Sequence, residues 1–212
     1  MVWLAALLAT AAAFAPPPVN ARQTQPDADW PADLVRRELG DDPNWGGEYL
    51  LDISTPATRG RIADLLRPMI QTRARKGFDA VEYDNLDSWT RFDGTPRADD
   101  VPFSKRAALA FARLITRRAH ALGLAVAQKN TVELTRAQVR RVGFDFAIAE
   151  ECGRYRECDG YRKLYGDHFV VIEYRRRDFR AACRAVGRRV SVVLRDRNVT
   201  APGSRTYRYD EC

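Results

Sequence analysis

Apolar segments of strand length alternate with longer amphipathic segments along most of this chain. The strand-like segments are residues 48–53, 80–83, 125–128, 144–149, 169–172 and 190–194. Segments with helical periodicity lie between them, at residues 58–76, 104–122, 135–142, 155–164 and 177–186. This alternation predicts about six βα units, and therefore an α/β fold with a parallel sheet covered by helices.

Local signals support these helices. In the segment 104–122, residues Leu109, Ala112, Ile115 and Ala119 recur on one helical face, as expected for a helix that packs against a sheet. Residues 32–39 predict a short helical piece before the first unit. Four of the helical segments end at a glycine that is expected to form a left-handed cap, and these are Gly77, Gly123, Gly143 and Gly187.

The first 21 residues have the pattern of an export signal. Trp3 to Ala15 is apolar, and it is shorter than the about 20 residues that a membrane-spanning helix needs. Three prolines follow it, and small residues at 19–21 suit signal-peptide cleavage. An ordinary N-terminal helix or a misplaced start codon is the alternative. We therefore expect a signal peptide at 1–21, a polar segment at 22–44 and one folded domain at 45–212.

The composition fits one domain with a substantial core, since 45% of the 212 residues are hydrophobic. The net charge of +7 raises anionic partners as a possibility. The basic residues are scattered, apart from small clusters such as residues 175–177, and no nucleic-acid-binding motif accompanies them. We expect basic outer helices, no nucleic-acid partner, and no stable membrane insertion once the signal is removed.

The four cysteines suggest disulfides, because their number is even and the chain has an export pattern. Cys152 and Cys158 are close enough to staple one loop, which leaves Cys183 to pair with Cys212. A zinc site is the alternative, but neither histidine has ligand spacing to a cysteine pair. We expect no metal site and no cofactor.

Charged or amide residues close every predicted strand. In chain order they are Asp52; Glu82, Asp84, Asn85 and Asp87; Lys129 and Asn130; Glu150 and Glu151; Glu173 and Tyr174; Arg195 and Asp196. The carboxyl ends of parallel strands converge on one face, so we expect these side chains to share a pocket. Paired carboxylates can divide the acid and base roles of glycoside hydrolysis. A Mg²⁺ or Ca²⁺ site is the alternative, but Lys129 adds positive charge to the ring.

Several motifs, in order, resemble glycoside hydrolase family 114. Residues 77–87 (GFDAVEYDNLD) resemble its signature GFDGVEPDNVD, and residues 119–130 resemble its AH-x-x-GL…KN segment. Residues 144–158 resemble its FDfa-x-NEqC-x-x-Y-x-eC stretch, and Glu173-Tyr174 matches its EY. Upstream, residues 45–53 resemble its W-x-GE…LDI. The resemblance covers residues 27–196.

The family's members are endo-α-1,4-polygalactosaminidases with a (β/α)8 barrel. The resemblance implies a secreted glycosidase that cleaves galactosamine-rich polysaccharide by a retaining mechanism, with Asp84 as nucleophile and Glu150 as general acid/base. The other strand-end residues would bind substrate, namely Asp52, Glu82, Asn85, Asp87, Lys129, Asn130, Glu151, Glu173 and Tyr174. The acidic ones would attract the sugar's ammonium groups. A catalytically impaired carbohydrate-binding remnant of the barrel is the alternative.

Compared with the family, two strands before residue 48 have no counterpart in this sequence. Six βα units do not close a barrel of the usual tilt and shear. We therefore expect Leu50, Val192 and Leu194 to be exposed where the absent strands would pair, unless another segment covers them. Candidates for the cover are the N-terminal apolar segment, a second copy of the chain, or residues of a longer gene product, and we favour the last.

Overall fold

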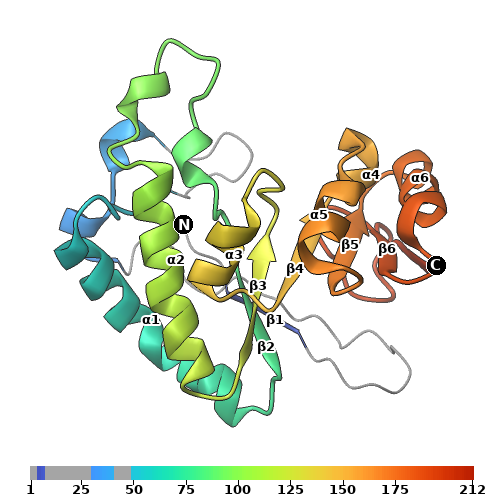
Figure 1. The fold of residues 1–212 in the computed structure, drawn as a ribbon, viewed down its shortest axis with the longest axis horizontal. Helices are drawn as coiled ribbons and strands as arrows, with labels where there is room; N and C mark the ends of the chain where they lie inside the picture. The colour runs from blue at the N-terminus through green and yellow to red at the C-terminus, as the bar shows by residue number, and fades with distance from the viewer. Residues whose placement is uncertain (1–3, 8–29, 41–48) are drawn as a thin grey trace.

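The structure, a computed structural model, describes residues 4–7, 30–40 and 49–212. Its centre is a seven-stranded sheet in which the strands follow one another in chain order (Figure 1). The strands are β1 (Leu4–Leu7), β2 (Ala80–Tyr83), β3 (Ala125–Lys129), β4 (Phe146–Glu150), β5 (Phe169–Glu173), β6 (Ser191–Arg195) and β7 (Tyr209–Glu211). Strands β2 to β6 are parallel, whereas β1 and β7 pair antiparallel at the two edges.

The α/β class and its βα repeats are confirmed. Helices α1 (Pro56–Arg75) and α2 (Lys105–His120) lie at one end of the molecule, and α4 (Cys152–Tyr155), α5 (Cys158–Tyr165) and α6 (Arg176–Val186) lie at the other, with α3 (Arg136–Val142) between them (Figure 1). Residues 155–164, expected as one helix, begin with the end of α4 and continue into α5. Residues 32–39 form two 3-10 turns, Ala32–Leu34 and Arg37–Leu39.

Side-chain caps explain where the longer helices begin. The Thr55 hydroxyl accepts from the Thr58 backbone at the start of α1, and Ser104 accepts from Ala107 at the start of α2. The buried face of α2 consists of Ala108, Phe111, Ala112, Ile115, Thr116 and Ala119. No described helix is both long and apolar enough to cross a membrane.

The expected first strand at residues 48–53 is wrong in its described part, residues 49–53. Leu51 makes only an isolated antiparallel bridge with Val35, and the Asp52 backbone donates to Leu34. The free edge of β2 is occupied instead by β1, whose residues fall inside the predicted export signal. The rest of that signal, most of the segment 22–44, and residues 45–48 lie outside the described residues.

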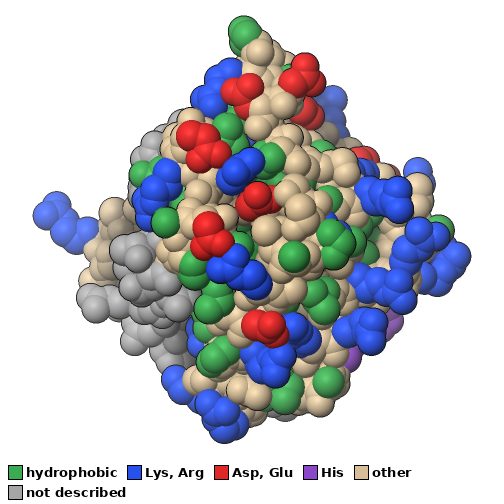
Figure 2. Space-filling model, turned by 90° about the vertical axis from the view of Figure 1, so that its left-hand side faces the viewer, with side chains coloured by type: hydrophobic (Ala, Val, Ile, Leu, Met, Phe, Trp, Pro, Cys, Tyr) green, Lys and Arg blue, Asp and Glu red, His purple; other side chains and the backbone are tan. Residues whose placement is uncertain are grey.

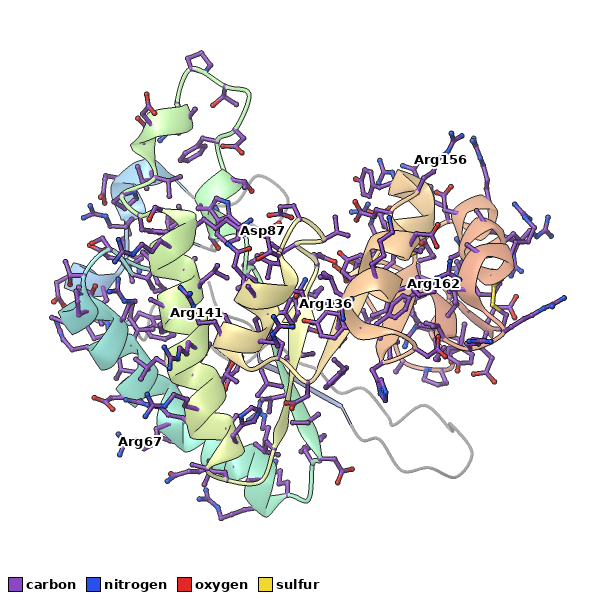
Figure 3. All side chains as sticks on the ribbon, in the orientation of Figure 1. Arg67, Asp87, Arg136, Arg141, Arg156 and Arg162 are labelled. Carbon is purple, nitrogen blue, oxygen red and sulfur yellow. A yellow bond between two sulfur atoms is a disulfide. The ribbon has the colours of Figure 1, made fainter. Side chains whose placement is uncertain are left out.

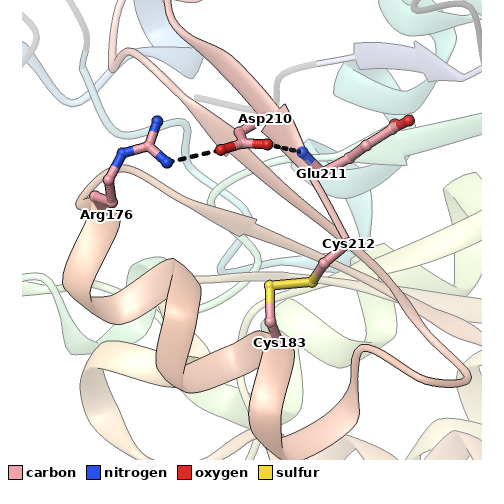
Figure 4. Close-up of a disulfide and its surroundings, with 5 residues drawn as sticks. All are labelled: Arg176, Cys183, Asp210, Glu211 and Cys212. Carbon is pink, nitrogen blue, oxygen red and sulfur yellow. Dashed lines mark hydrogen bonds and ion pairs between the residues drawn. A yellow bond between two sulfur atoms is a disulfide. The ribbon is translucent and has the colours of Figure 1, made fainter.

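Leu50, Val192 and Leu194 are all buried, and the segment that covers the β6 edge is not one of the three expected candidates. That segment is β7, which pairs antiparallel along Val193 to Arg195. A disulfide between Cys183 on α6 and Cys212 holds this strand, and Arg176 forms a 2.7 Å ion pair with Asp210 beside it (Figure 4). Among the described strands no pairing joins β7 to β1, so the described sheet is open.

Both expected disulfides are present in the structure, Cys152–Cys158 and Cys183–Cys212. Three of the four expected glycine caps have positive φ, but Gly187 has φ −62° and is not left-handed. Gly187 instead lets the chain pass close to the Cys183–Cys212 disulfide, since a Cβ there would lie 2.7 Å from the Cys183 carbonyl oxygen and 2.9 Å from Cys212 Sγ. On the face shown in Figure 2, basic side chains are scattered among acidic and apolar ones.

Candidate active site

Lys129 lies at the centre of a cluster built by three adjacent parallel strands. Its Nζ is 3.1 Å from Glu82 Oε1, 2.9 Å from Asp84 Oδ1 and 3.3 Å from Glu150 Oε2. The sheet register explains this meeting. Glu82 pairs with Ala127, so two residues further along Asp84 lies opposite Lys129, with both side chains on the same face. The predicted convergence of these strand ends is therefore seen directly.

The cluster has a buried and an accessible layer. The side chains of Lys129 and Glu82 are 6% and 5% exposed, whereas those of Asp84 and Glu150 are 30% and 27% exposed. Burial raises the pKa of Glu82 to about 7, against the opposing effect of Lys129. Burial alone would lower the pKa of Lys129, but the three carboxylates together raise it well above its usual value. The ammonium therefore stays protonated among the three carboxyl groups.

A backbone pattern repeats at the three strands that build this cluster. The residue directly after Asp84, Lys129 or Glu150 has positive φ: 55° at Asn85, 45° at Asn130 and 57° at Glu151. Left-handed turns are tolerated by Asn but cost a non-Gly residue such as Glu more. Strain of this kind, of order 1–3 kcal/mol per residue, concentrates at functional sites. Each of these turns directly follows a side chain that joins the cluster.

Hydrogen bonds hold the Asp84 carboxylate and both the backbone and the carboxyl group of Glu150. The Asn85 backbone donates to Asp84 Oδ1 at 2.8 Å, and the Glu150 backbone donates to Asn130 Oδ1 at 2.8 Å. The Tyr174 hydroxyl donates to Glu150 Oε1. Burial, with the neighbouring Glu150 charge, raises the pKa of Tyr174, which keeps its hydroxyl protonated. Asn85 itself is exposed.

One shared ammonium also limits how far apart the two accessible carboxylates are. Because Asp84 Oδ1 and Glu150 Oε2 lie 2.9 and 3.3 Å from the same Nζ, these two oxygens are separated by at most about 6.2 Å. Retaining glycosidases hold their carboxyl groups ~5–5.5 Å apart, and inverting ones ~6.5–9.5 Å apart. The geometry suits nucleophilic attack by one carboxylate better than placement of a water between the two.

Two of the predicted acids lie next to this cluster in different settings. Glu151 is paired with Arg154 at 2.8 Å and with Arg197 at 3.2 Å. Glu173 is fully buried, and its Oε1 accepts from the Gly153 backbone at 2.6 Å. Its Oε2 has no hydrogen-bond partner among the described residues, and burial raises the pKa of Glu173 to about 7. In this structure neither Glu173 nor Glu82 is accessible to a sugar.

The other two predicted acids, Asp52 and Asp87, form no ion pair with Lys129 among the described contacts. Asp52 Oδ1 accepts from the backbone and hydroxyl of Ser54, and its Oδ2 lies 3.8 Å from Arg36. It thus caps a turn in the segment before α1, and no described contact joins it to the Lys129 cluster. Asp87 follows β2, near the upper end of α2 (Figure 3), and its pKa is raised, chiefly by burial.

Sequence reasoning did not single out Arg154 or Arg197 as neighbours of the site. No local pattern connects Arg197 to Glu151, a glutamate 46 residues away.

An apolar cavity opens on the α2 side of Asp84. Leu50, Ile53, Phe103 and Phe111 line it, together with polar groups at its mouth from Asn85 and Ser88. Its lining does not include Lys129 or Glu150, so it is distinct from the space between the two carboxylates. In the described part of the chain, no group of three or more His, Cys, Asp or Glu side chains is arranged to hold a metal ion.

The family model of "Glycoside-hydrolase family GH114" matches residues 19–211. Among solved structures, the crystal structure of Aspergillus fumigatus Ega3 in complex with galactosamine is similar, with a TM-score of 0.67 at 23% identity, over 90% of this chain and 74% of that chain. At this identity the likeness concerns the fold, and it agrees with the predicted barrel type. No curated protein matches the chain. Because the family match spans nearly the whole sequence, this chain belongs to glycoside-hydrolase family GH114.

Proposed function

We propose that this protein hydrolyses α-1,4-linked, galactosamine-containing polysaccharide with retention of configuration, and that it acts outside the cell. Asp84 is the nucleophile and Glu150 the general acid/base. The observation that carries this proposal is the single Lys129 ammonium shared by both carboxyl groups, which keeps the two bound oxygens closer together than the carboxyl groups of an inverting pair. Membership of a glycoside-hydrolase family supplies the reaction class.

The steps follow from the positions of these groups. Glu150 donates a proton to the glycosidic oxygen as Asp84 attacks the anomeric carbon, so the leaving sugar departs as an alcohol and a glycosyl ester forms on Asp84. Glu150, now ionised, takes a proton from water, and the resulting hydroxide displaces Asp84 at the same carbon. Tyr174 orients the Glu150 carboxyl group, while Lys129 holds both carboxylates in place.

The substrate class rests on charge. The cluster places three carboxyl groups around one ammonium, so it is negatively charged whenever at least two of them are ionised, and this favours a sugar that carries its own ammonium group. The structural relative Ega3 was solved with galactosamine. Because Glu82 and Glu173 are buried, contact with the amine falls to the accessible Asp84 and Glu150 and to Asp87, with Asn85 and Asn130 beside them.

Extracellular action is supported by the two disulfides, which persist in oxidising compartments. The Cys152–Cys158 bridge lies directly after Glu150 and Glu151, so an oxidising environment would also stabilise one side of the site.

The test is release of reducing sugar from partly deacetylated polygalactosamine, with the anomer of the first product read by NMR. Asp84→Asn and Glu150→Gln should each reduce turnover at least about 100-fold without changing the melting temperature. Asp99→Asn, the same chemical change at an exposed residue, is the control. An inverted first product would reject the retaining mechanism, and binding of the polymer without hydrolysis would favour the carbohydrate-binding alternative.

A further inference from the structure

A continuous series of contacts leads from Glu150 outward to an exposed aromatic ring. The Tyr174 hydroxyl contacts Glu150, and the Arg197 guanidinium lies 5.4 Å from the Tyr174 ring centroid. Arg197 pairs with Glu151, which pairs with Arg154, whose guanidinium lies 5.1 Å from the Tyr155 ring centroid. We call these five residues, Glu151, Arg154, Tyr155, Tyr174 and Arg197, the arginine wall. It adjoins the catalytic pair on the side away from Lys129's partner Glu82.

Tyr155 is exposed although its backbone is tightly held. The residue is 58% exposed, and the other exposed large hydrophobic residues of the described chain are Leu65 and Leu122. Tyr155 ends α4, which begins at the Cys152–Cys158 disulfide and is anchored by the Gly153–Glu173 hydrogen bond. An aromatic ring held in this way can stack on a sugar face with little ordering cost.

The arginine wall and the catalytic cluster differ in charge. The wall carries two guanidinium groups and one carboxylate, whereas the cluster places three carboxyl groups around a single ammonium. Arg156, the next residue after Tyr155, is also exposed and extends away from the sheet (Figure 3). A sugar that carries an ammonium group is therefore favoured at the cluster and disfavoured at the wall.

We propose that the arginine wall is a separate sugar subsite that selects an uncharged, N-acetylated unit next to the cleaved bond. Tyr155 stacks on the face of that sugar, and the Arg197 guanidinium donates to its acetamido carbonyl oxygen. The inference rests on the proposed function, because it assumes a polymer of aminosugars. It adds that the enzyme cleaves at boundaries, with a free amine on one side of the bond and an N-acetyl group on the other.

Binding to the wall is tested without hydrolysis. In the inactive Asp84→Asn background, fully N-acetylated and fully deacetylated galactosamine oligomers are titrated by calorimetry. Tyr155→Ala should weaken binding of the acetylated oligomer about fivefold to tenfold, and Tyr155→Phe should not. Leu65→Ala, an exposed apolar residue on α1, is the control. Equal affinities of Tyr155→Ala and its parent for the acetylated oligomer would overturn the subsite.

Selectivity is tested on the active protein. Partly acetylated oligomers are digested and the new chain ends are sequenced by mass spectrometry. N-acetylated units should be enriched several-fold on one side of the cleaved bond, and Arg197→Gln should reduce that enrichment while Arg67→Gln on α1 should not. An even distribution of N-acetyl groups around the bond would overturn the inference while leaving the proposed function intact. Absence of all cleavage would instead reject the proposed function, and the calorimetric result would stand.

Discussion

Lys129 and Glu82 form an ion pair of 3.1 Å in which neither side chain is more than 6% exposed. The pair lies beneath Asp84 and Glu150 and supports them from the sheet side. A buried pair of this kind contributes little net stability, but removing one partner leaves an uncompensated charge. The pair matters here for geometry rather than for stability, because its ammonium sets the positions of both accessible carboxyl groups.

Replacement of this lysine should therefore affect folding and activity together. Lys129→Met leaves three clustered carboxylates without a cation and should lower the free energy of unfolding by about 3 kcal/mol. Lys163→Met, an exposed lysine on α5, should change it by less than about 0.5 kcal/mol. Urea unfolding measures both. If the lost charge is the cause, adding Glu82→Gln to Lys129→Met should restore part of the stability, and a further loss in the double variant would contradict this explanation.

Glu173 should make stability depend on pH. Burial raises its pKa in the folded protein from an ordinary value of 4.5 to about 7, so folding takes up a proton between these values. Its stabilising contribution is fully present below pH 4.5 and is lost as the pH rises through about 7. Glu173→Gln should remove this loss. The free energy of unfolding of the variant, relative to that of wild type, should therefore be about 2 kcal/mol higher at pH 8 than at pH 5. A difference between the two proteins that does not change with pH would show that Glu173 titrates normally.

Two glycines offer a matched pair of substitutions. A Cβ at Gly153 would lie 2.6 Å from the Asp178 carbonyl oxygen and 2.9 Å from Glu173 Oε1, whereas one at Gly60, within α1, would have no neighbour within 4 Å. Gly153→Ala should destabilise the protein by about 1–3 kcal/mol and shift the turn that carries Tyr155. Gly60→Ala should stabilise it by about 0.5–1 kcal/mol. If both substitutions moved the melting temperature in the same direction, the space around each glycine would not explain its effect on stability.

The two disulfides should contribute unequally. Cys183–Cys212 closes a loop with a sequence separation of 29, and Cys152–Cys158 one with a separation of 6. The chain-entropy model gives about 3–4 kcal/mol for the first and about 2 kcal/mol for the second. Paired Cys→Ser variants, compared by thermal unfolding, should follow this order. The shorter bridge should nevertheless have the larger effect on substrate binding, because it holds the arginine wall.

The sheet interior could be predicted from the sequence because its signals are local. Strands β2 to β6 are short apolar runs separated by amphipathic segments, and their register brings strand-end residues together. The edges could not be predicted in this way. Strand β7, with the sequence Tyr-Asp-Glu, has no apolar alternation, and only its pairing with β6 and the Cys183–Cys212 bridge make it a strand. Residues 49–53 have a strand-like pattern but pair with the turn near Leu34 instead.

The candidate site likewise has a part that could be predicted from the sequence and a part that could not. The meeting of Asp84, Lys129 and Glu150 follows from parallel strands, and it could be foreseen. Burial separated the remaining acids in a way that the sequence did not reveal, since Glu82 and Glu173 look the same in the sequence as their accessible neighbours. Arg197 belongs to a loop after β6, and its contact with Glu151 depends on tertiary structure alone.

The acidic cluster lies at the base of a site in a chain whose net charge is +7. A polymer with free amino groups is repelled by the protein at long range and attracted only within a few ångströms of the carboxylates. Salt screens charges beyond a Debye length of ~8–10 Å and acts much less on partly buried pairs. Moderate ionic strength should therefore speed the encounter with such a polymer, whereas most electrostatically steered enzymes are slowed by salt.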